Sequence, residues 1–205
     1  MVSDFRFMYR PIIIGITGGI GSGKTTISEI LQNNGYFVYN SDSEARRIQN
    51  ENEKVRKLTS ELFGDDIYVH NELNRKKVAS MVFGNPELLK KLSSIVHPAV
   101  EEDFHNWILK HFDADFLFFE SAIMFEAGFN KMVDKVILIT ASEDERIRRV
   151  VNRDGSNIEQ VKSRMSHQLD ENLIKEKVDA IVNTENGPPD INFLNNIIAH
   201  VIQKK

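Results

Sequence analysis

Eight consecutive residues near the start of the chain have the types and spacing of a phosphate-binding loop. They match Gly-x-x-x-x-Gly-Lys-Thr in full and are Gly18, Gly19, Ile20, Gly21, Ser22, Gly23, Lys24 and Thr25. The glycines let backbone N–H groups converge on phosphate oxygens, and a following helix adds the positive end of its dipole. The Lys24 ammonium suits the β- and γ-phosphates, and the Thr25 hydroxyl suits Mg²⁺. The pattern predicts binding of ATP with Mg²⁺, in a site that we extend to Thr26.

The residues around this loop indicate which class of phosphate-loop protein it belongs to. A GTPase would carry Asn-Lys-x-Asp, but the nearest segment, Asn130–Asp134, is one residue too long. A helical pattern follows the second apolar run, and an arginine-rich segment follows the fourth. This layout is typical of a small-molecule kinase, in which the insertion holds the acceptor and the arginine segment closes as a lid that excludes water.

Two carboxylates are candidates for work beside the phosphates. Asp42 lies just past the second predicted strand, where a side chain points into the ligand crevice of a parallel sheet. There it can accept a proton from an acceptor hydroxyl or help to bind Mg²⁺, or it can cap a helix that begins near Ser43. Glu120 ends the third predicted strand, where a carboxylate on the metal side, a cap or a supporting residue are all open.

Basic residues crowd the segment after the fourth strand. They are Arg146, Arg148, Arg149, Arg153, Lys162 and Arg164. Arg149 and Arg153 are four residues apart and share a helical face, where arginine can clamp a triphosphate and spread transition-state charge. The alternative is a solvated face that pairs with the acidic residues 143–145. His97, before Pro98, is more typical of packing than of catalysis.

These residues need a scaffold, and the hydrophobic pattern predicts one. The predicted strands are Pro11–Thr17, Tyr36–Asn40, Phe116–Glu120, Lys135–Thr140 and Asp179–Asn183. The predicted helices outside the insertion are 24–33, Ser142–Arg153, Ile158–Leu169 and Asp190–Gln203. Strands separated by helices imply parallel pairing. We predict an α/β P-loop fold with a five-stranded parallel sheet, a helical acceptor-binding insertion at about 43–112 and an arginine-rich lid at about 142–170.

Composition limits the remaining possibilities. With 205 residues, 41% hydrophobic content and no cysteine, the chain suits one kinase domain without disulfides. The net charge of −4 argues against a nucleic-acid partner, and no apolar run approaches the roughly 20 residues of a membrane helix. Met1–Arg10 does not have the pattern of a signal peptide. We expect a cytoplasmic monomer or small homo-oligomer.

From Ile14 to about Asn186 the chain resembles the dephospho-coenzyme A kinase family. The segments that carry the resemblance are Ile16–Lys24, Leu73-Asn74-Arg75, Val82-Phe83, Asn85-Pro86, His97-Pro98, Phe125-Glu126, Arg149, Arg153-Asp154-Gly155, Arg164 and Gln168. The resemblance implies transfer of the ATP γ-phosphate to the ribose 3′-hydroxyl of dephospho-coenzyme A, the last step of coenzyme A synthesis.

The resemblance also implies roles for individual residues. It makes Asp42 the catalytic base, helped by Lys24 and Arg149, and assigns ATP contacts to Arg149 and Arg153. Acceptor contacts are implied for Asp42, Arg75, His97, Glu126, Arg164 and Gln168. The adenine-side asparagine is Asn183 or Asn186.

The chain departs from the family pattern in two places. The family's Asp-Ala-Asp is Asn40-Ser41-Asp42 here, so position 40 loses its carboxylate. Glu120–Met124 replaces the usual Asp-x-Pro-Leu-Leu. The alternatives to a dephospho-coenzyme A kinase are a kinase for another hydroxylated metabolite or nucleotide, and a module that binds ATP without turnover.

Overall fold

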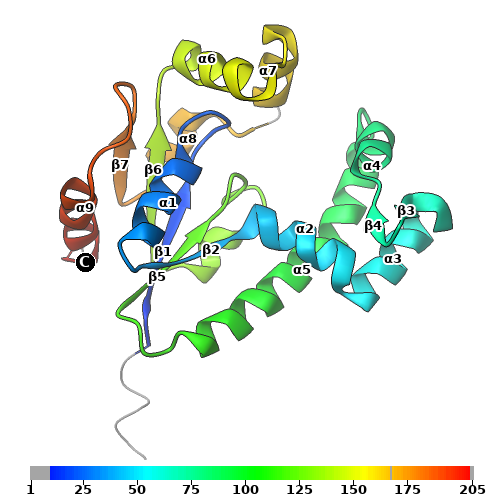
Figure 1. Cartoon of the computed structure of the whole chain (residues 1–205), viewed down its shortest axis with the longest axis horizontal. Helices are drawn as coiled ribbons and strands as arrows, with labels where there is room; N and C mark the ends of the chain where they lie inside the picture. Colours follow the sequence, from blue (N-terminus) through cyan, green and yellow to red (C-terminus); the bar gives the residue numbers. More distant parts are fainter. Residues whose placement is uncertain (1–9, 167, 204–205) are drawn as a thin grey trace, which may run out of the picture. The chain divides into compact units, whose positions relative to one another are not determined.

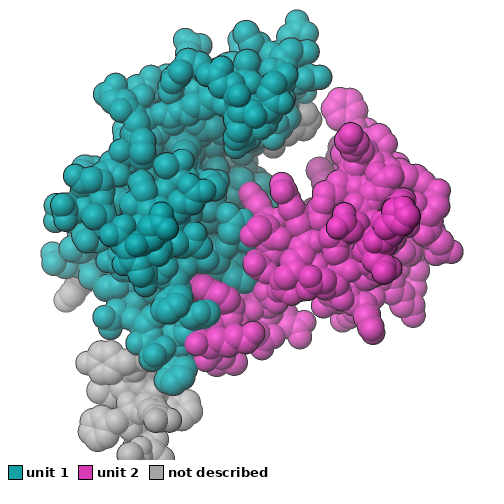
Figure 2. All heavy atoms as spheres, viewed as in Figure 1, with its two compact units in different colours: residues 1–40, 111–205 teal, residues 41–110 magenta. Residues whose placement is uncertain are grey.

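The computed structural model describes residues 10–166 and 168–203 of the chain. The segment Met1–Tyr9, where we expected no signal peptide, lies outside the described residues. Figure 2 colours the two compact units, residues 1–40 with 111–205 and residues 41–110. No helix in the described part of the chain is both long and apolar enough to cross a membrane.

A five-stranded parallel sheet forms the centre of the first unit (Figure 1). Its strands are β1 (Ile12–Thr17), β2 (Phe37–Asn40), β5 (Phe116–Glu120), β6 (Lys135–Thr140) and β7 (Ala180–Asn183). The order is β2-β5-β1-β6-β7, which places β1 in the middle. Runs such as IIIGIT and FLFFE are apolar at almost every position because a parallel sheet is covered on both faces. Parallel pairing brings the carboxyl ends of all five strands to one edge.

Helices of the first unit cover the sheet and extend its carboxyl edge. They are α1 (Lys24–Asn33), α6 (Glu143–Asp154), α7 (Ile158–Met165), α8 (Glu171–Lys175), α9 (Ile191–Gln203) and the 3₁₀ helix η2 (Phe129–Met132). Ile27 and Leu31 of α1 pack with Leu194 and Ile198 of α9 against Ile14 and other strand residues in one buried cluster. Helices α6 and α7 share a smaller cluster of Ile147, Val150 and Val161.

The second unit is mainly helical, as the sequence pattern predicts. Its elements are α2 (Ser41–Glu51), α3 (Glu53–Phe63), η1 (Asp65–Ile67), β3 (Tyr68–Val69), β4 (Glu72–Leu73), α4 (Arg75–Val82) and α5 (Pro86–Lys110). The hairpin β3–β4 was not predicted. His70 and Asn71 form its turn with φ of 49° and 67°, the left-handed conformation that two-residue hairpin turns require.

The predicted sheet is confirmed, whereas some helix ends differ from prediction. The predicted helix Ile158–Leu169 ends at Met165. There the Ser166 hydroxyl donates to the Ser163 carbonyl, a local bond that competes with the helical pattern. The helix expected near Ser43 begins at Ser41, directly after β2. Asp42 therefore lies inside the first turn of α2, and the alternative in which it is the N-cap of a helix that begins near Ser43 is wrong.

Candidate active site

The phosphate loop connects the end of β1 to the start of α1. Helix α1 begins at Lys24 after Gly23, whose φ of 92° is left-handed and whose position carries no side-chain cap. The first N–H groups of α1 therefore donate no hydrogen bond to a side chain at Gly23. Within the loop, the Ser22 N–H donates to the Gly19 carbonyl at 3.1 Å. This tight turn before an uncapped helix end is the arrangement that binds phosphate.

Gly21 and Gly19 are loop positions that have no room for a β-carbon. The φ of Gly21 is +80°, and a β-carbon built there would lie 2.4 Å from the backbone oxygen of Arg146. At Gly19 a β-carbon would lie 2.0 Å from the Arg146 guanidinium. The loop is therefore packed directly against the first turn of α6.

Lys24 and Thr25 are the first two residues of α1. Lys24 is 8% exposed, and its ammonium donates to the carbonyls of Gly18 at 2.7 Å and Gly19 at 3.2 Å. The Thr25 hydroxyl lies 3.4 Å from Oε1 of Glu120, and the Asn40 amide donates to Oε2 at 2.8 Å. Register explains this meeting, because Asn40 and Glu120 are paired at the carboxyl ends of β2 and β5.

This cluster has the chemistry of a Mg²⁺ site. Glu120 is 3% exposed, and both hydrogen-bond partners that the described residues supply to it are neutral. A buried carboxylate without a cation is costly, and Mg²⁺ prefers carboxylate, hydroxyl and phosphate oxygens. No group of three or more His, Cys, Asp or Glu side chains in the described chain could hold a metal. Mg²⁺ beside phosphates takes only one or two carboxylates, so Thr25 and Glu120 fit that ion.

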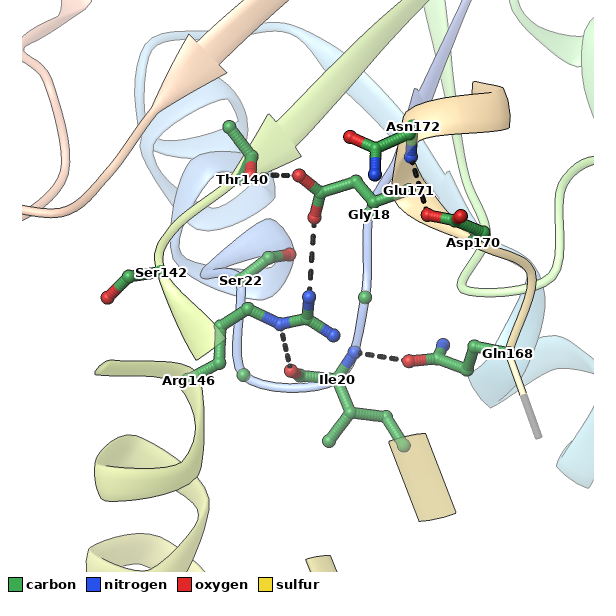
Figure 3. Close-up of polar contacts among 12 residues, drawn as sticks. Gly18, Ile20, Ser22, Thr140, Ser142, Arg146, Gln168, Asp170, Glu171 and Asn172 are labelled. Atoms are coloured by element: carbon green, nitrogen blue, oxygen red, sulfur yellow. Dashed lines mark hydrogen bonds and ion pairs between the residues drawn. The ribbon is translucent and has the colours of Figure 1, made fainter. Parts of the chain in front are cut away.

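Arg146 and Gln168 hold the phosphate loop at Ile20 (Figure 3). The Arg146 Nε donates to the Ile20 carbonyl at 3.0 Å, and the Ile20 N–H donates to Oε1 of Gln168 at 2.8 Å. Arg146 also pairs with Glu171 at 3.3 Å, and Glu171 accepts from the Thr140 hydroxyl at 2.6 Å. Burial lowers the pKa of Arg146, with Glu171 acting in the opposite direction. The lid segment thus contacts the two peptide units that flank Ile20 of the loop.

Arg149 joins the same loop to the end of β7. Its guanidinium donates to the hydroxyl and carbonyl of Thr184, with a longer contact of 3.4 Å to the Gly21 carbonyl. Its Nε donates to Glu145 at 2.8 Å. Hydrogen bonds to Glu145 from Arg148 and then Arg149 lower the pKa of Glu145 to about 2. Arg149 is therefore held as a fixed cation beside the phosphate loop.

Arg153 and Arg164 lie in a different environment. Both pair with Asp154, and their side chains are 62% and 50% exposed. The hydrogen bond from Arg153, joined by Arg164, lowers the pKa of Asp154 to about 2. The shared face predicted for Arg149 and Arg153 does not bring both to the phosphate loop in this structure, because Arg153 is one turn further along α6.

A cavity of about 360 Å³ opens beside the phosphate loop. It is lined by Thr17, Gly18, Gly19, Ala122, Glu126, Glu143, Arg146, Lys162, Met165, Ser166, Gln168, Leu169, Asp170, Glu171 and Ile174. Its wall thus comes from the loop, the segment after β5 and helices α6 to α8. Glu126 accepts from the Leu169 N–H at 3.1 Å, which joins two of these walls.

Comparison with known proteins gives this site a family. The dephospho-CoA kinase family model matches residues 12–190. Among curated relatives, the dephospho-CoA kinase of Porphyromonas gingivalis is 40% identical over 179 residues, with 87% of each chain covered. The chain belongs to the dephospho-CoA kinase family. It is accordingly an ATP-dependent kinase, a transferase of coenzyme A biosynthesis.

Two solved structures share the fold of this chain. A crystal structure from Thermus thermophilus superimposes with a TM-score of 0.80 at 32% identity, covering 96% of this chain and 98% of the other. The dephospho-CoA kinase from Campylobacter jejuni gives 0.62 at 26% identity, with 94% and 96% covered.

Three residues that the family resemblance assigns to chemistry or the acceptor belong to the second unit of this kinase. Asp42 is exposed in the first turn of α2. Arg75, the first residue of α4, donates to the Gln49 side chain at 3.0 Å and the Arg46 carbonyl at 3.1 Å. His97 lies inside α5, and burial lowers its pKa.

Sequence reasoning missed several residues that the structure places around the phosphate loop. Arg146 was named only as part of the arginine cluster, and Thr140, Glu171 and Thr184 were not singled out. Nearness to strand ends is the signal that finds three of these residues, because Thr140 ends β6, Arg146 lies in the first turns of α6 and Thr184 follows β7. Asn183, one of two adenine-side candidates, accepts from the Glu185 N–H and shapes the same turn.

Proposed function

We propose that this kinase transfers the γ-phosphate of ATP to the ribose 3′-hydroxyl of dephospho-CoA, giving coenzyme A and ADP. The observation that carries the proposal is the family match over residues 12–190, on a chain whose phosphate loop has the required geometry. The bond from the 3′-oxygen to the γ-phosphorus forms as the bond from that phosphorus to the β,γ-bridging oxygen breaks. The hydroxyl proton leaves to a base, and ADP is the leaving group.

The residues of the first unit bind ATP in this proposal. The loop N–H groups and the start of α1 hold the phosphates, and Lys24 turns from the carbonyls of Gly18 and Gly19 to phosphate oxygens. Thr25 and Glu120 would hold Mg²⁺, which neutralises charge between the phosphates when bound. Arg149 supplies positive charge beside the loop. Arg153 contacts ATP once the lid has closed.

The residues of the second unit serve the acceptor. Asp42 accepts the proton of the 3′-hydroxyl, and Arg75 and His97 bind dephospho-CoA. From the first unit, Glu126, Arg164 and Gln168 complete the acceptor contacts. The pKa of Arg75 is lowered by burial, but arginine keeps its charge at neutral pH and suits an anionic acceptor.

The acceptor can be tested with a panel. ADP release is measured with dephospho-CoA, adenosine, AMP and shikimate side by side, each with and without Mg²⁺. We expect turnover with dephospho-CoA to exceed that with the other acceptors by about 10²-fold or more, since a site that hydrogen-bonds its substrate rejects analogues strongly. A product phosphorylated at the 3′ position, identified by NMR, completes the assignment. Faster turnover of another acceptor would replace dephospho-CoA as the substrate.

Further properties of the proposal concern the protein as a whole. We expect it to act in the cytoplasm, as a monomer or small homo-oligomer, without a nucleic-acid partner.

The role of Mg²⁺ can be tested apart from activity, by measuring ATP affinity with and without the ion in the wild-type protein and in Glu120→Gln. The affinity gained from Mg²⁺ should shrink in the variant, and an unchanged gain would remove Glu120 from the metal site.

A further inference from the structure

Glu171 occupies a junction between three elements of the first unit. Its carboxylate accepts from the Thr140 hydroxyl at the end of β6 at 2.6 Å and pairs with Arg146 of α6 at 3.3 Å. A third contact, to Lys175 of its own helix α8, measures 3.0 Å. The side chains of Arg146 and Glu171 are 11% and 20% exposed, so this ion pair is largely shielded from water.

The contacts of Glu171 continue through Arg146 to Ile20 of the phosphate loop. Arg146, held by Glu171, donates to the Ile20 carbonyl, while Gln168 accepts from the Ile20 N–H (Figure 3). The Ile20 side chain packs against the cluster formed by α6 and α7. Residues of the lid segment thus contact the carbonyl, the N–H and the side chain of Ile20.

The electrostatics make Glu171 the partner that keeps Arg146 in this place. Burial opposes the charged form of Arg146, and the negative charge of Glu171 is the largest influence in the other direction, with Glu143 next. The Thr140 hydroxyl fixes the carboxylate in turn. Without Glu171, the guanidinium would lose its nearest counter-ion while remaining largely buried, and moving toward water would relieve that cost. The Ile20 carbonyl would then lose its donor.

We propose that Glu171 is a positioning residue for ATP binding, which acts by holding Arg146 against Ile20 and Gly19 of the phosphate loop. A loop whose peptide units are already oriented binds phosphate without the cost of ordering them. The inference rests on the proposed function only in taking ATP as the ligand of the loop. Glu171 is assigned no contact with the nucleotide.

A double-mutant cycle tests whether Glu171 acts through Arg146. The affinity for ATP is measured by calorimetry, without acceptor, in the wild type, Glu171→Ala, Arg146→Ala and the double variant. We expect Glu171→Ala to weaken ATP binding about tenfold, within the range of coupling between residues in contact. In the Arg146→Ala background the same substitution should change affinity less than about twofold. An equal loss in both backgrounds, or no loss in either, would overturn the proposal.

Two further variants separate positioning from folding. Lys175→Ala removes another partner of Glu171 but leaves the branch to Arg146, and we expect its ATP affinity to stay within about twofold of the wild type. Glu171→Gln keeps the shape and loses the charge, so it should weaken ATP binding in the same direction but less. If Glu171→Ala does not fold, Glu171→Gln takes its place in the cycle. Because no acceptor is present, an error in the acceptor assignment would leave these measurements untouched and appear only in the substrate panel.

Discussion

Replacement of Gly21 by alanine tests the contact between the phosphate loop and helix α6. Alanine would have to adopt a φ of +80°, which costs about 1–2 kcal/mol for a residue with a β-carbon. The added β-carbon would also lie 2.4 Å from the backbone oxygen of Arg146, whereas ordinary contact begins at 3.4 Å. Because the obstacle is backbone, the loop and α6 must separate by about 1 Å.

A shift of that size should be visible in turnover. A misplacement of about 1 Å at a reacting group can cost about 10² in rate. We therefore expect Gly21→Ala to lower kcat about 10²-fold, with weaker ATP binding. The assays are ADP release under saturating substrates and calorimetry for ATP, with the free energy of unfolding measured by urea denaturation.

Gly35→Ala is the matched control for Gly21→Ala. Gly35 has a φ of +86°, but a β-carbon there would have no atom within 4 Å. It should lose the same roughly 1–2 kcal/mol of stability and keep the wild-type kcat. If Gly21→Ala lost no more stability than Gly35→Ala and kept normal turnover, the loop would not be packed against α6 as the structure has it.

Three other substitutions test individual roles. Lys24→Ala should lower kcat by about 10²–10³ with an unchanged circular dichroism spectrum, and a folded variant with normal turnover would remove Lys24 from the mechanism. Arg149→Ala should weaken ATP binding and turnover much more than Arg153→Ala, because only Arg149 contacts the loop; calorimetry showing the reverse order would mean that the lid rearranges around ATP. Asp42→Asn should lower kcat by about 10²–10⁴ while both substrates bind normally. Recovery at high Mg²⁺ would make Asp42 a metal residue, and full activity at ordinary Mg²⁺ would exclude it as the base.

Local patterns were enough to predict the scaffold of the site. The strands Phe116–Glu120 and Lys135–Thr140 and the helix Lys24–Asn33 have the predicted bounds, and the glycine loop lies between its strand and helix. Each of these elements is indicated by residues that are close along the chain, either as an apolar run or as a helical period. The sequence did not predict the hairpin β3–β4 or the end of α7 at Met165. Both features are short, and in both the local hydrogen bonds of turns compete with the hydrophobic period.

The choice among the arginines shows the limit of sequence spacing. Arg149 and Arg153 are compatible with one face, but a residue four positions along a helix lies about 6 Å further along its axis. Because α6 starts next to the carboxyl end of β6, only its first turns meet the phosphate loop, and Arg146 and Arg149 fill those positions. The spacing of the arginines in the sequence does not show how far each one lies from the sheet and the phosphate loop.

The sequence by itself determined the phosphate loop, the parallel sheet and the kind of chemistry, because these depend on residues that are close along the chain. Tertiary structure decided which distant residues meet the loop. Glu120 reaches Thr25 because β5 pairs beside β1, and Glu171 reaches Thr140 across 31 positions. Such contacts depend on how packed elements bring remote side chains together, and no local period of the sequence records that distance.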